Sequence, residues 1–96
     1  MSNTSELVTV LGKLIGKEYR IDGWLGRLVE ELDRELSKIN CKVKLYSVNY
    51  TVDRGRVDRI NYAEILVYCN EQYIFVKIYV DFIKYVRVLD ARIEGV

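Results

Sequence analysis

Aromatic and basic side chains that could bind a partner recur at every second position of one stretch, Gln72–Val80. Its odd positions carry Tyr73, Phe75, Lys77 and Tyr79, while its even positions after Gln72 are all aliphatic. Aromatic rings can stack on nucleic-acid bases or bury themselves against another protein, and lysine can pair with a phosphate or a carboxylate. This chemistry is that of binding rather than of catalysis.

Residues for most kinds of catalysis are missing from the chain. It contains no histidine, which excludes His-dependent triads and most zinc hydrolase sites. Its glycines match neither a phosphate-binding loop nor a dinucleotide-binding fingerprint. Carboxylates could still serve metal-dependent hydrolysis, but each also fits a helix surface, a turn or a cross-strand pair: Glu30, Glu31, Asp53, Asp58, Glu64 and Glu71. We therefore expect no enzyme activity, no cofactor and no metal site.

Length and composition favour a small globular protein. The 96 residues suit a single domain, 1–96, and half of them are hydrophobic. The formal net charge of +1 gives no global electrostatic reason to bind nucleic acid or an anionic membrane. No apolar run reaches the roughly 20 residues of a membrane span, and the first residues lack the features of a signal peptide. We expect a cytoplasmic protein that does not associate with membranes.

Hydrophobic periodicity predicts two helices in the N-terminal part of the chain. The second begins after Asp22, a good N-cap, and runs to about Ile39, before Asn40 can close it. The apolar stripe of the first helix is Leu7, Val8, Leu11, Leu14 and Ile15, and that of the second is Trp24, Leu25, Leu28, Val29, Leu32, Leu36 and Ile39.

From Cys41 onward the hydrophobic period changes to two, and β-branched and aromatic residues become frequent. Turns are expected at Asp53–Arg56 and Cys69–Gln72, between antiparallel strands. The last segment, 82–93, fits either a strand or a helical stripe, and we favour the strand. The expected fold is α+β, with two N-terminal helices packed on one face of a three- to four-stranded antiparallel meander as a two-layer sandwich.

The turns allow the register of the hairpins to be worked out. A two-residue turn after Cys69 pairs Ile65 with Val76, and a three-residue turn around Gly55 pairs Leu45 with Ile65. These aliphatic residues share one side of the sheet, which we expect to pack on the helices. The opposite side then forms a candidate interface or nucleic-acid face: Lys42, Lys44, Tyr46, Tyr50, Tyr62, Leu66, Tyr68, Tyr73, Phe75, Lys77 and Tyr79.

The two cysteines, Cys41 and Cys69, face each other in this register. They could form a disulfide if their geometry allows it, but a cytoplasmic chain usually keeps its thiols reduced. The absence of proline and histidine, with abundant Val, Ile, Lys, Arg and Glu, leans towards a heat-adapted source, in which cytoplasmic disulfides are a known exception. We favour buried free thiols.

Two functions would use the aromatic side of the sheet. We favour a non-catalytic protein-interaction module that self-associates as a dimer or binds another protein, because tyrosines are frequent in interface cores. The alternative is a nucleic-acid-binding protein, in which bases stack on the rings while the lysines and a basic turn hold phosphates. Acidic residues such as Glu64, opposite Lys77, weigh against it. The basic turn comprises Arg54, Arg56 and Arg59.

A third arrangement would cover the aromatic side of the sheet with the last segment of the chain or with the first helix.

Overall fold

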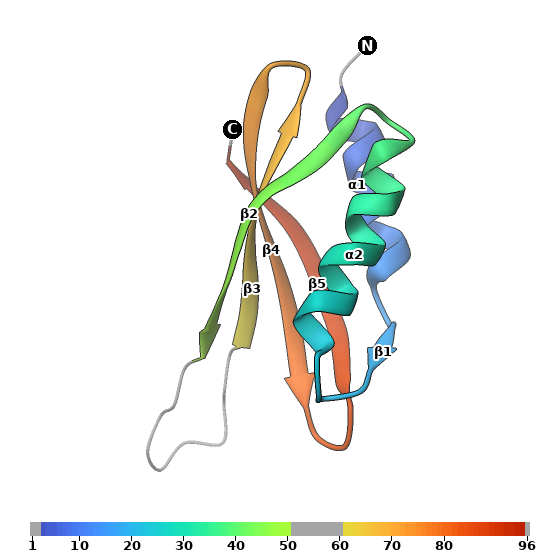
Figure 1. The fold of residues 1–96 in the computed structure, drawn as a ribbon, viewed down its shortest axis with the longest axis vertical. Coiled ribbons are helices and arrows are strands. Elements are labelled where there is room, and N and C mark those ends of the chain that lie inside the picture. The colour runs from blue at the N-terminus through green and yellow to red at the C-terminus, as the bar shows by residue number, and fades with distance from the viewer. Residues whose placement is uncertain (1–2, 51–60, 96) are drawn as a thin grey trace.

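A computed structural model describes residues 3–50 and 61–95, which form two helices and a five-stranded antiparallel sheet (Figure 1). The elements are α1 (Asn3–Leu14), β1 (Glu18–Tyr19), α2 (Trp24–Ser37), β2 (Cys41–Tyr50), β3 (Asn61–Cys69), β4 (Gln72–Phe82) and β5 (Val86–Gly95). The α+β class, the antiparallel sheet and the strand character of the last segment are confirmed. The sheet has five strands rather than three or four, and it is strongly curled beside the helix pair.

The additional strand, β1, lies between the two helices in the sequence. Gly16, two residues after the end of α1, takes a left-handed conformation (φ 88°), and its N–H donates to the Val88 carbonyl at 2.8 Å. The Val88 N–H donates in turn to the Lys17 carbonyl at 2.9 Å. These bonds guide β1 onto Val86 and Arg87 of β5, so the strand order is β1-β5-β4-β3-β2.

Each helix buries one apolar stripe against the sheet. The expectation that Val8 and Ile15 belong to the stripe of α1 is wrong, because both are exposed. Each directly follows a buried leucine, and successive helical residues point about 100° apart. The buried residues are Leu7, Val10, Leu11 and Leu14 in α1 and Trp24, Leu28, Leu32 and Leu36 in α2.

The ends of α2 are set by backbone conformation. Its N-cap is Gly23 rather than Asp22, with a left-handed φ of 73° and no side-chain capping hydrogen bond. The Asp22 carbonyl instead accepts a hydrogen bond from Arg27 Nη1 at 3.0 Å. The helix ends at Ser37 with Lys38 as its C-cap, two residues before the predicted end at Ile39, and Asn40 lies beyond it with a left-handed φ of 59°.

The β3–β4 hairpin has the expected register. Asn70 and Glu71 form its two-residue turn, with φ values of 46° and 63°, and Cys69 pairs with Gln72. Alternate residues along both strands are therefore buried on the helix side of the sheet: Ala63, Ile65, Val67, Cys69, Ile74, Val76, Ile78 and Val80.

The pairing of β2 with β3 changes at a β-bulge at Lys44. Beyond the bulge Leu45 pairs with Leu66, so the expected pairing of Leu45 with Ile65 is wrong. One inserted residue moves every following side chain to the other face of the sheet. Tyr46, which now pairs with Ile65, is therefore on the helix side of the register instead of the opposite side.

Cys41 and Cys69 are joined by a disulfide between β2 and β3, so the expectation of free thiols is wrong. Their Cα atoms lie 4.5 Å apart, because the two residues are directly opposite each other in the ladder. Both cysteines are buried. The disulfide ties the start of β2 to the end of β3.

Replacing Gly23 by alanine should lower the free energy of unfolding by about 1 to 2 kcal/mol, because an L side chain is disfavoured at its left-handed φ. The matched control is Gly26→Ala inside α2, which should raise it by about 0.5 to 1 kcal/mol. A Cβ would meet no atom within 4 Å at either glycine, so steric clashes do not contribute. Urea unfolding measures both values, and equal effects at the two positions would refute the explanation.

Reducing the disulfide should lower the stability by about 3 to 4 kcal/mol, since it releases a closed loop in the unfolded chain. The sequence separation of the two cysteines is 28. Thermal unfolding with and without a phosphine reductant tests this, with a Cys41→Ala/Cys69→Ala variant as the control that should ignore the reductant. Thiols that react in the denatured, unreduced protein would show that the bond is not formed.

Candidate functional site

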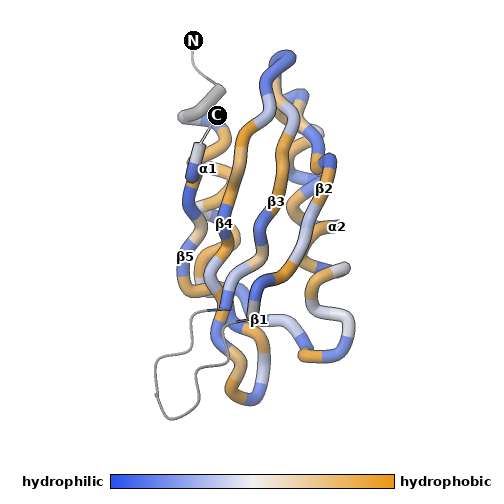
Figure 2. The backbone as a smooth tube through the Cα atoms, turned by 90° about the vertical axis from the view of Figure 1, so that its left-hand side faces the viewer, coloured by the Kyte–Doolittle hydropathy of each residue, from blue (hydrophilic) through white to orange (hydrophobic). Residues whose placement is uncertain are grey.

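The candidate site is the face of the sheet turned away from the helices, which we call the outer face. β3 and β4 lie at its centre with β2 beside them, while α1 and α2 lie behind the sheet (Figure 2). β5 pairs with β4 along the edge instead of folding across the face. No described element covers the outer face, so its side chains are not part of the core.

Cross-strand pairing arranges the outer face in rows that run across the strands. One row, the apolar row, contains Leu45, Leu66 and Phe75, and it continues to Gly95 on β5. Leu45 is 67% exposed and Phe75 is 46% exposed, whereas Leu66 is partly buried between them. The bulge at Lys44 is what brings Leu45 into this row.

The next row, the charged row, carries charges of both signs. It contains Ser47, Glu64, Lys77 and Arg92, one from each of the strands β2 to β5. Glu64 accepts a hydrogen bond from the Asn49 amide at 3.4 Å. The acidic side chain therefore lies on β3 and the basic ones on β4 and β5.

Two aromatic rows flank the apolar and charged rows. Tyr68 pairs with Tyr73 at one end, with 5.0 Å between ring centroids, and Tyr62 pairs with Tyr79 at the other, with 5.7 Å. Such tilted ring pairs add to the energy of apolar burial. The rings are thus held in place by cross-strand contacts within the chain.

The basic side chains of the outer face lie over these rings. A cation near the face of a ring is attracted by its negative charge distribution. The distances to the ring centroids are 4.7 Å for Lys77 over Tyr62, 5.6 Å for Arg92 over Tyr79, and 5.9 Å and 6.0 Å for Lys42 and Lys44 over Tyr68. These contacts restrict the conformations of the lysine and arginine side chains.

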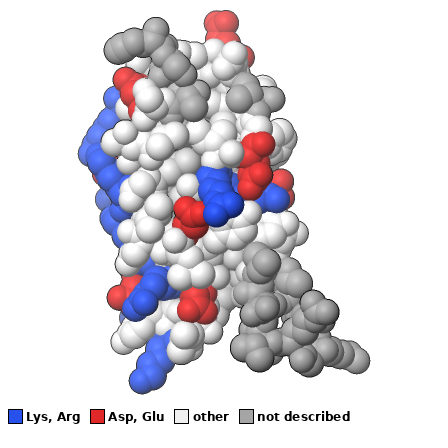
Figure 3. Space-filling model, turned by 180° about the vertical axis from the view of Figure 1, so that it is seen from behind, with Lys and Arg blue, Asp and Glu red and all other residues white. Residues whose placement is uncertain are grey.

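Acidic groups adjoin the basic ones. Arg92 Nε donates to Asp90 Oδ2 at 2.6 Å, and the Ala91 N–H donates to Asp90 Oδ1 at 2.9 Å. The Arg92 hydrogen bond and then the Ala91 one lower the pKa of Asp90 below its ordinary value of 3.8. The Tyr79 hydroxyl donates to Glu94 at 3.3 Å. Figure 3, the view from behind, likewise shows basic and acidic side chains side by side, amid uncharged surface.

A hollow of about 320 Å³ opens on the outer face between the apolar and charged rows. Its lining is mostly apolar, with one carboxylate. It could accept an apolar side chain from a partner more readily than a charged ligand. The lining residues are Leu45, Ser47, Glu64, Leu66 and Phe75 of the outer face, together with Tyr46, which lies between Leu45 and Ser47 in the chain.

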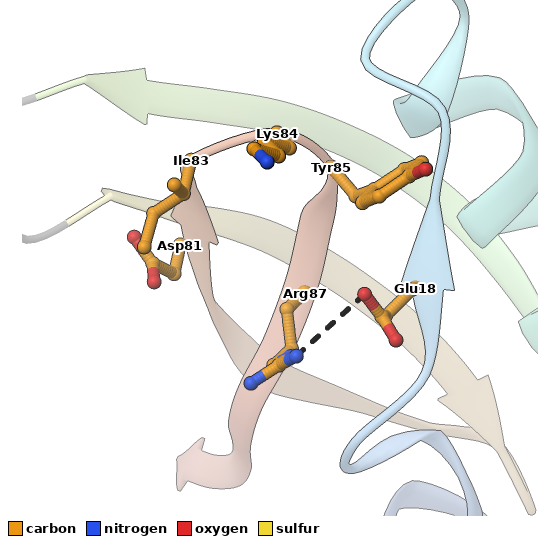
Figure 4. Close-up of a pocket in the computed structure, with 6 residues that line it drawn as sticks. All are labelled: Glu18, Asp81, Ile83, Lys84, Tyr85 and Arg87. Atoms are coloured by element: carbon orange, nitrogen blue, oxygen red, sulfur yellow. Dashed lines mark ion pairs between the residues drawn. The ribbon is translucent and has the colours of Figure 1, made fainter.

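A second hollow, of about 270 Å³, lies where β1, β5 and the turn between β4 and β5 meet (Figure 4). Arg87 and Glu18 form an ion pair of 3.7 Å across it, and the exposed Ile83, Lys84 and Tyr85 come from the turn. Among the residues that the structure describes, no group of three or more Cys, Asp and Glu side chains could hold a metal ion. This hollow offers a surface ion pair and no assembled chemical site.

Most of the residues expected on the candidate face lie together on the outer face. Tyr46 is the exception, because the bulge turns it to the helix side of the register. The side chain of Tyr50, and all of Arg54, Arg56 and Arg59, lie outside the described residues. The residues brought together are Lys42, Lys44, Tyr62, Leu66, Tyr68, Tyr73, Phe75, Lys77 and Tyr79.

Pattern reasoning missed the outer-face residues that follow bulges. Leu45 and Ser47 follow the bulge at Lys44, and Asp90 and Arg92 follow a similar shift at Leu89 of β5. Regular alternation places residues on the wrong side beyond such a shift. A further shift lies at Glu94, and none of the three shifted positions is a glycine, so no local signal in the sequence identifies the bulges.

Comparison with protein-family models, with curated proteins and with solved structures finds no match to this chain. In the described ranges, no helix has the length and apolar character needed to cross a membrane. The function is therefore inferred from the side chains of the outer face.

The Arg92→Gln substitution should raise the pKa of Asp90 towards its ordinary value, since it removes the main hydrogen bond that favours the carboxylate. A pKa lowered by folding means that the carboxylate contributes stability above the unfolded-state pKa, and that this contribution is lost as the pH falls through the folded-state pKa. The stability difference between wild type and variant should therefore disappear in acid. NMR titration of the Asp90 carboxyl carbon measures the shift, and an unchanged pKa would contradict the assignment.

Proposed function

We propose that this protein is a small non-catalytic interaction module that binds a protein partner, most simply a second copy of itself, through its outer face. The observation that carries the proposal is the apolar row. Leu45 and Phe75 present large apolar side chains to solvent beside Leu66, and no described part of the chain covers them. Contiguous exposed apolar surface on a folded protein generally marks an interaction site.

The aromatic rows support this proposal. Tyrosine is enriched at interface cores because its ring buries a large apolar area while its hydroxyl finds a polar partner. Tyr73, at 50% exposure, has most to gain from burial by a partner. The ring pairs and the cations over them already restrict these side chains, so binding costs less conformational entropy.

Nucleic-acid binding through the same face is the weaker proposal. Its support is that the exposed rings of Tyr73 and Phe75 could each stack on a base. Phosphate binding would need several cations without acidic neighbours. Arg92 is instead hydrogen-bonded to Asp90, and Lys77 is directly opposite Glu64.

The wild-type protein should be a dimer at micromolar concentration, and Phe75→Asp should make it monomeric. A buried anchor at an interface centre contributes about 2 kcal/mol or more, and a carboxylate there would also have to be desolvated. The matched control is Val8→Asp, at a residue 56% exposed on α1, which lies on the other face of the sheet. Sedimentation equilibrium measures the dissociation constants.

A monomeric wild type, or a dimer equally stable with Phe75→Asp, would contradict self-association through the outer face. Repeating the measurement with single-stranded DNA and RNA at low and high salt tests the weaker proposal. Salt-sensitive binding to a monomer would then favour it.

A further inference from the structure

The outer face is complementary to itself in one particular orientation. We propose that two copies pack face to face about a two-fold axis that runs parallel to the strands, midway between β3 and β4. This inference rests on the proposed function, and it adds the arrangement of the two copies. Such an axis keeps each row over the same row of the partner, while it places β3 over the partner's β4 and β2 over the partner's β5. Packed sheets ordinarily keep their strands aligned within about 30°.

Charge complementarity is the first argument for this axis. Glu64 lies on β3 and Lys77 lies opposite it on β4, so the two-fold axis sets Glu64 against the partner's Lys77 and Lys77 against the partner's Glu64. Among the ion pairs between described residues, none includes either side chain. Glu64 accepts only the 3.4 Å hydrogen bond from Asn49, and Lys77 lies over the Tyr62 ring, so neither charge is neutralised by an ion pair among the described residues. Each dimer gains two ion pairs.

The fit of the apolar row is the second argument. The same axis places the partner's Phe75 over Leu66, at the hollow of about 320 Å³ that Leu45 and Leu66 help to line. Phe75 projects from the face with 46% of its surface exposed. Each copy thus offers one aromatic side chain and one hollow, as a symmetric interface requires.

Gly95 is the third argument. Because β2 lies over the partner's β5, Leu45 falls over the partner's Gly95, which ends the apolar row. A Cβ at Gly95 would meet no atom within 4 Å in its own chain, so the glycine leaves open space there. Leu45, the most exposed residue of the row, can occupy that space.

A two-fold axis perpendicular to the strands does not give this match. If that axis passed through the charged row, it would set Glu64 against the partner's Glu64 and Lys77 against the partner's Lys77. If it passed through the apolar row, it would set the Glu64 carboxylate against the partner's Tyr68. Like charges in contact and a buried unpaired carboxylate both oppose association. Of these three positions of the two-fold axis, the one parallel to the strands pairs opposite charges.

Charge reversal in one copy at a time tests the arrangement. Glu64→Lys alone and Lys77→Glu alone each place two like-charge contacts in the homodimer, and each should raise the dimer dissociation constant by about tenfold or more. An equimolar mixture of the two variants should form a heterodimer close to wild-type affinity, because both of its contacts are then between lysine and glutamate. A tag on one variant separates the species by mass, and circular dichroism melting confirms that each variant is folded.

A substitution that does not alter charge gives an independent test. Gly95→Val should weaken the dimer by about tenfold or more, since it fills the space proposed for the partner's Leu45. It should not lower the melting temperature of the dilute monomer, because a Cβ at this position meets no atom within 4 Å outside its chain neighbours. This test decides the matter if either charge variant fails to fold.

The outcomes separate this inference from the function on which it rests. The two-fold arrangement would be overturned, and the interaction module would stand, under three conditions together. Phe75→Asp disrupts the dimer, the two charge variants form no heterodimer when mixed, and Gly95→Val leaves the dimer as strong as wild type. A monomeric wild type would overturn both. Heterodimer formation together with a weakened Gly95→Val dimer would support both.

Discussion

Burial of the aliphatic side of β3 and β4 against the two helices is the constraint on which the rest of the structure depends. Leu28 and Leu32 of α2 are completely buried, as are Ile65 and Val76 of the two central strands. Side chains alternate along a strand, so the burial of one set directs the other set to solvent. The aromatic and charged residues of the outer face are thus exposed as a direct consequence of core packing.

The bulges decide the composition of the outer face at its margins. Without the bulge at Lys44, Leu45 would point towards the helices, Lys44 would take its place opposite Leu66, and Tyr46 would lie opposite Glu64. The shift at Leu89 acts in the same way on β5, where it pairs Asp90 with Tyr79 on the outer face. Bulges commonly re-aim side chains near functional surfaces. Here they complete an apolar row beside a row of mixed charge.

Fold and proposed function are connected through the small size of the protein. A chain of 96 residues leaves a large share of its apolar surface exposed, and in this chain part of that surface, from Leu45, Tyr73 and Phe75, lies on the outer face. A partner that covers the apolar row would stabilise the folded state by mass action. The change of charge sign between Glu64 and Lys77, across the centre of the same face, allows that partner to be an identical copy.

The sequence by itself determined the two helices, the α+β class and the β3–β4 hairpin with its tyrosines on one side. These features follow from local periodicity and from a two-residue turn, Asn70–Glu71, which a short stretch of chain encodes. Only the tertiary structure decided the pairing of β1 with β5, the bulges and the Cys41–Cys69 disulfide. A two-residue strand and a bulge at a non-glycine position have no local pattern, because their energies depend on contacts between residues far apart in the chain. The core of the candidate site was therefore predictable, while Leu45, Asp90 and Arg92 were not.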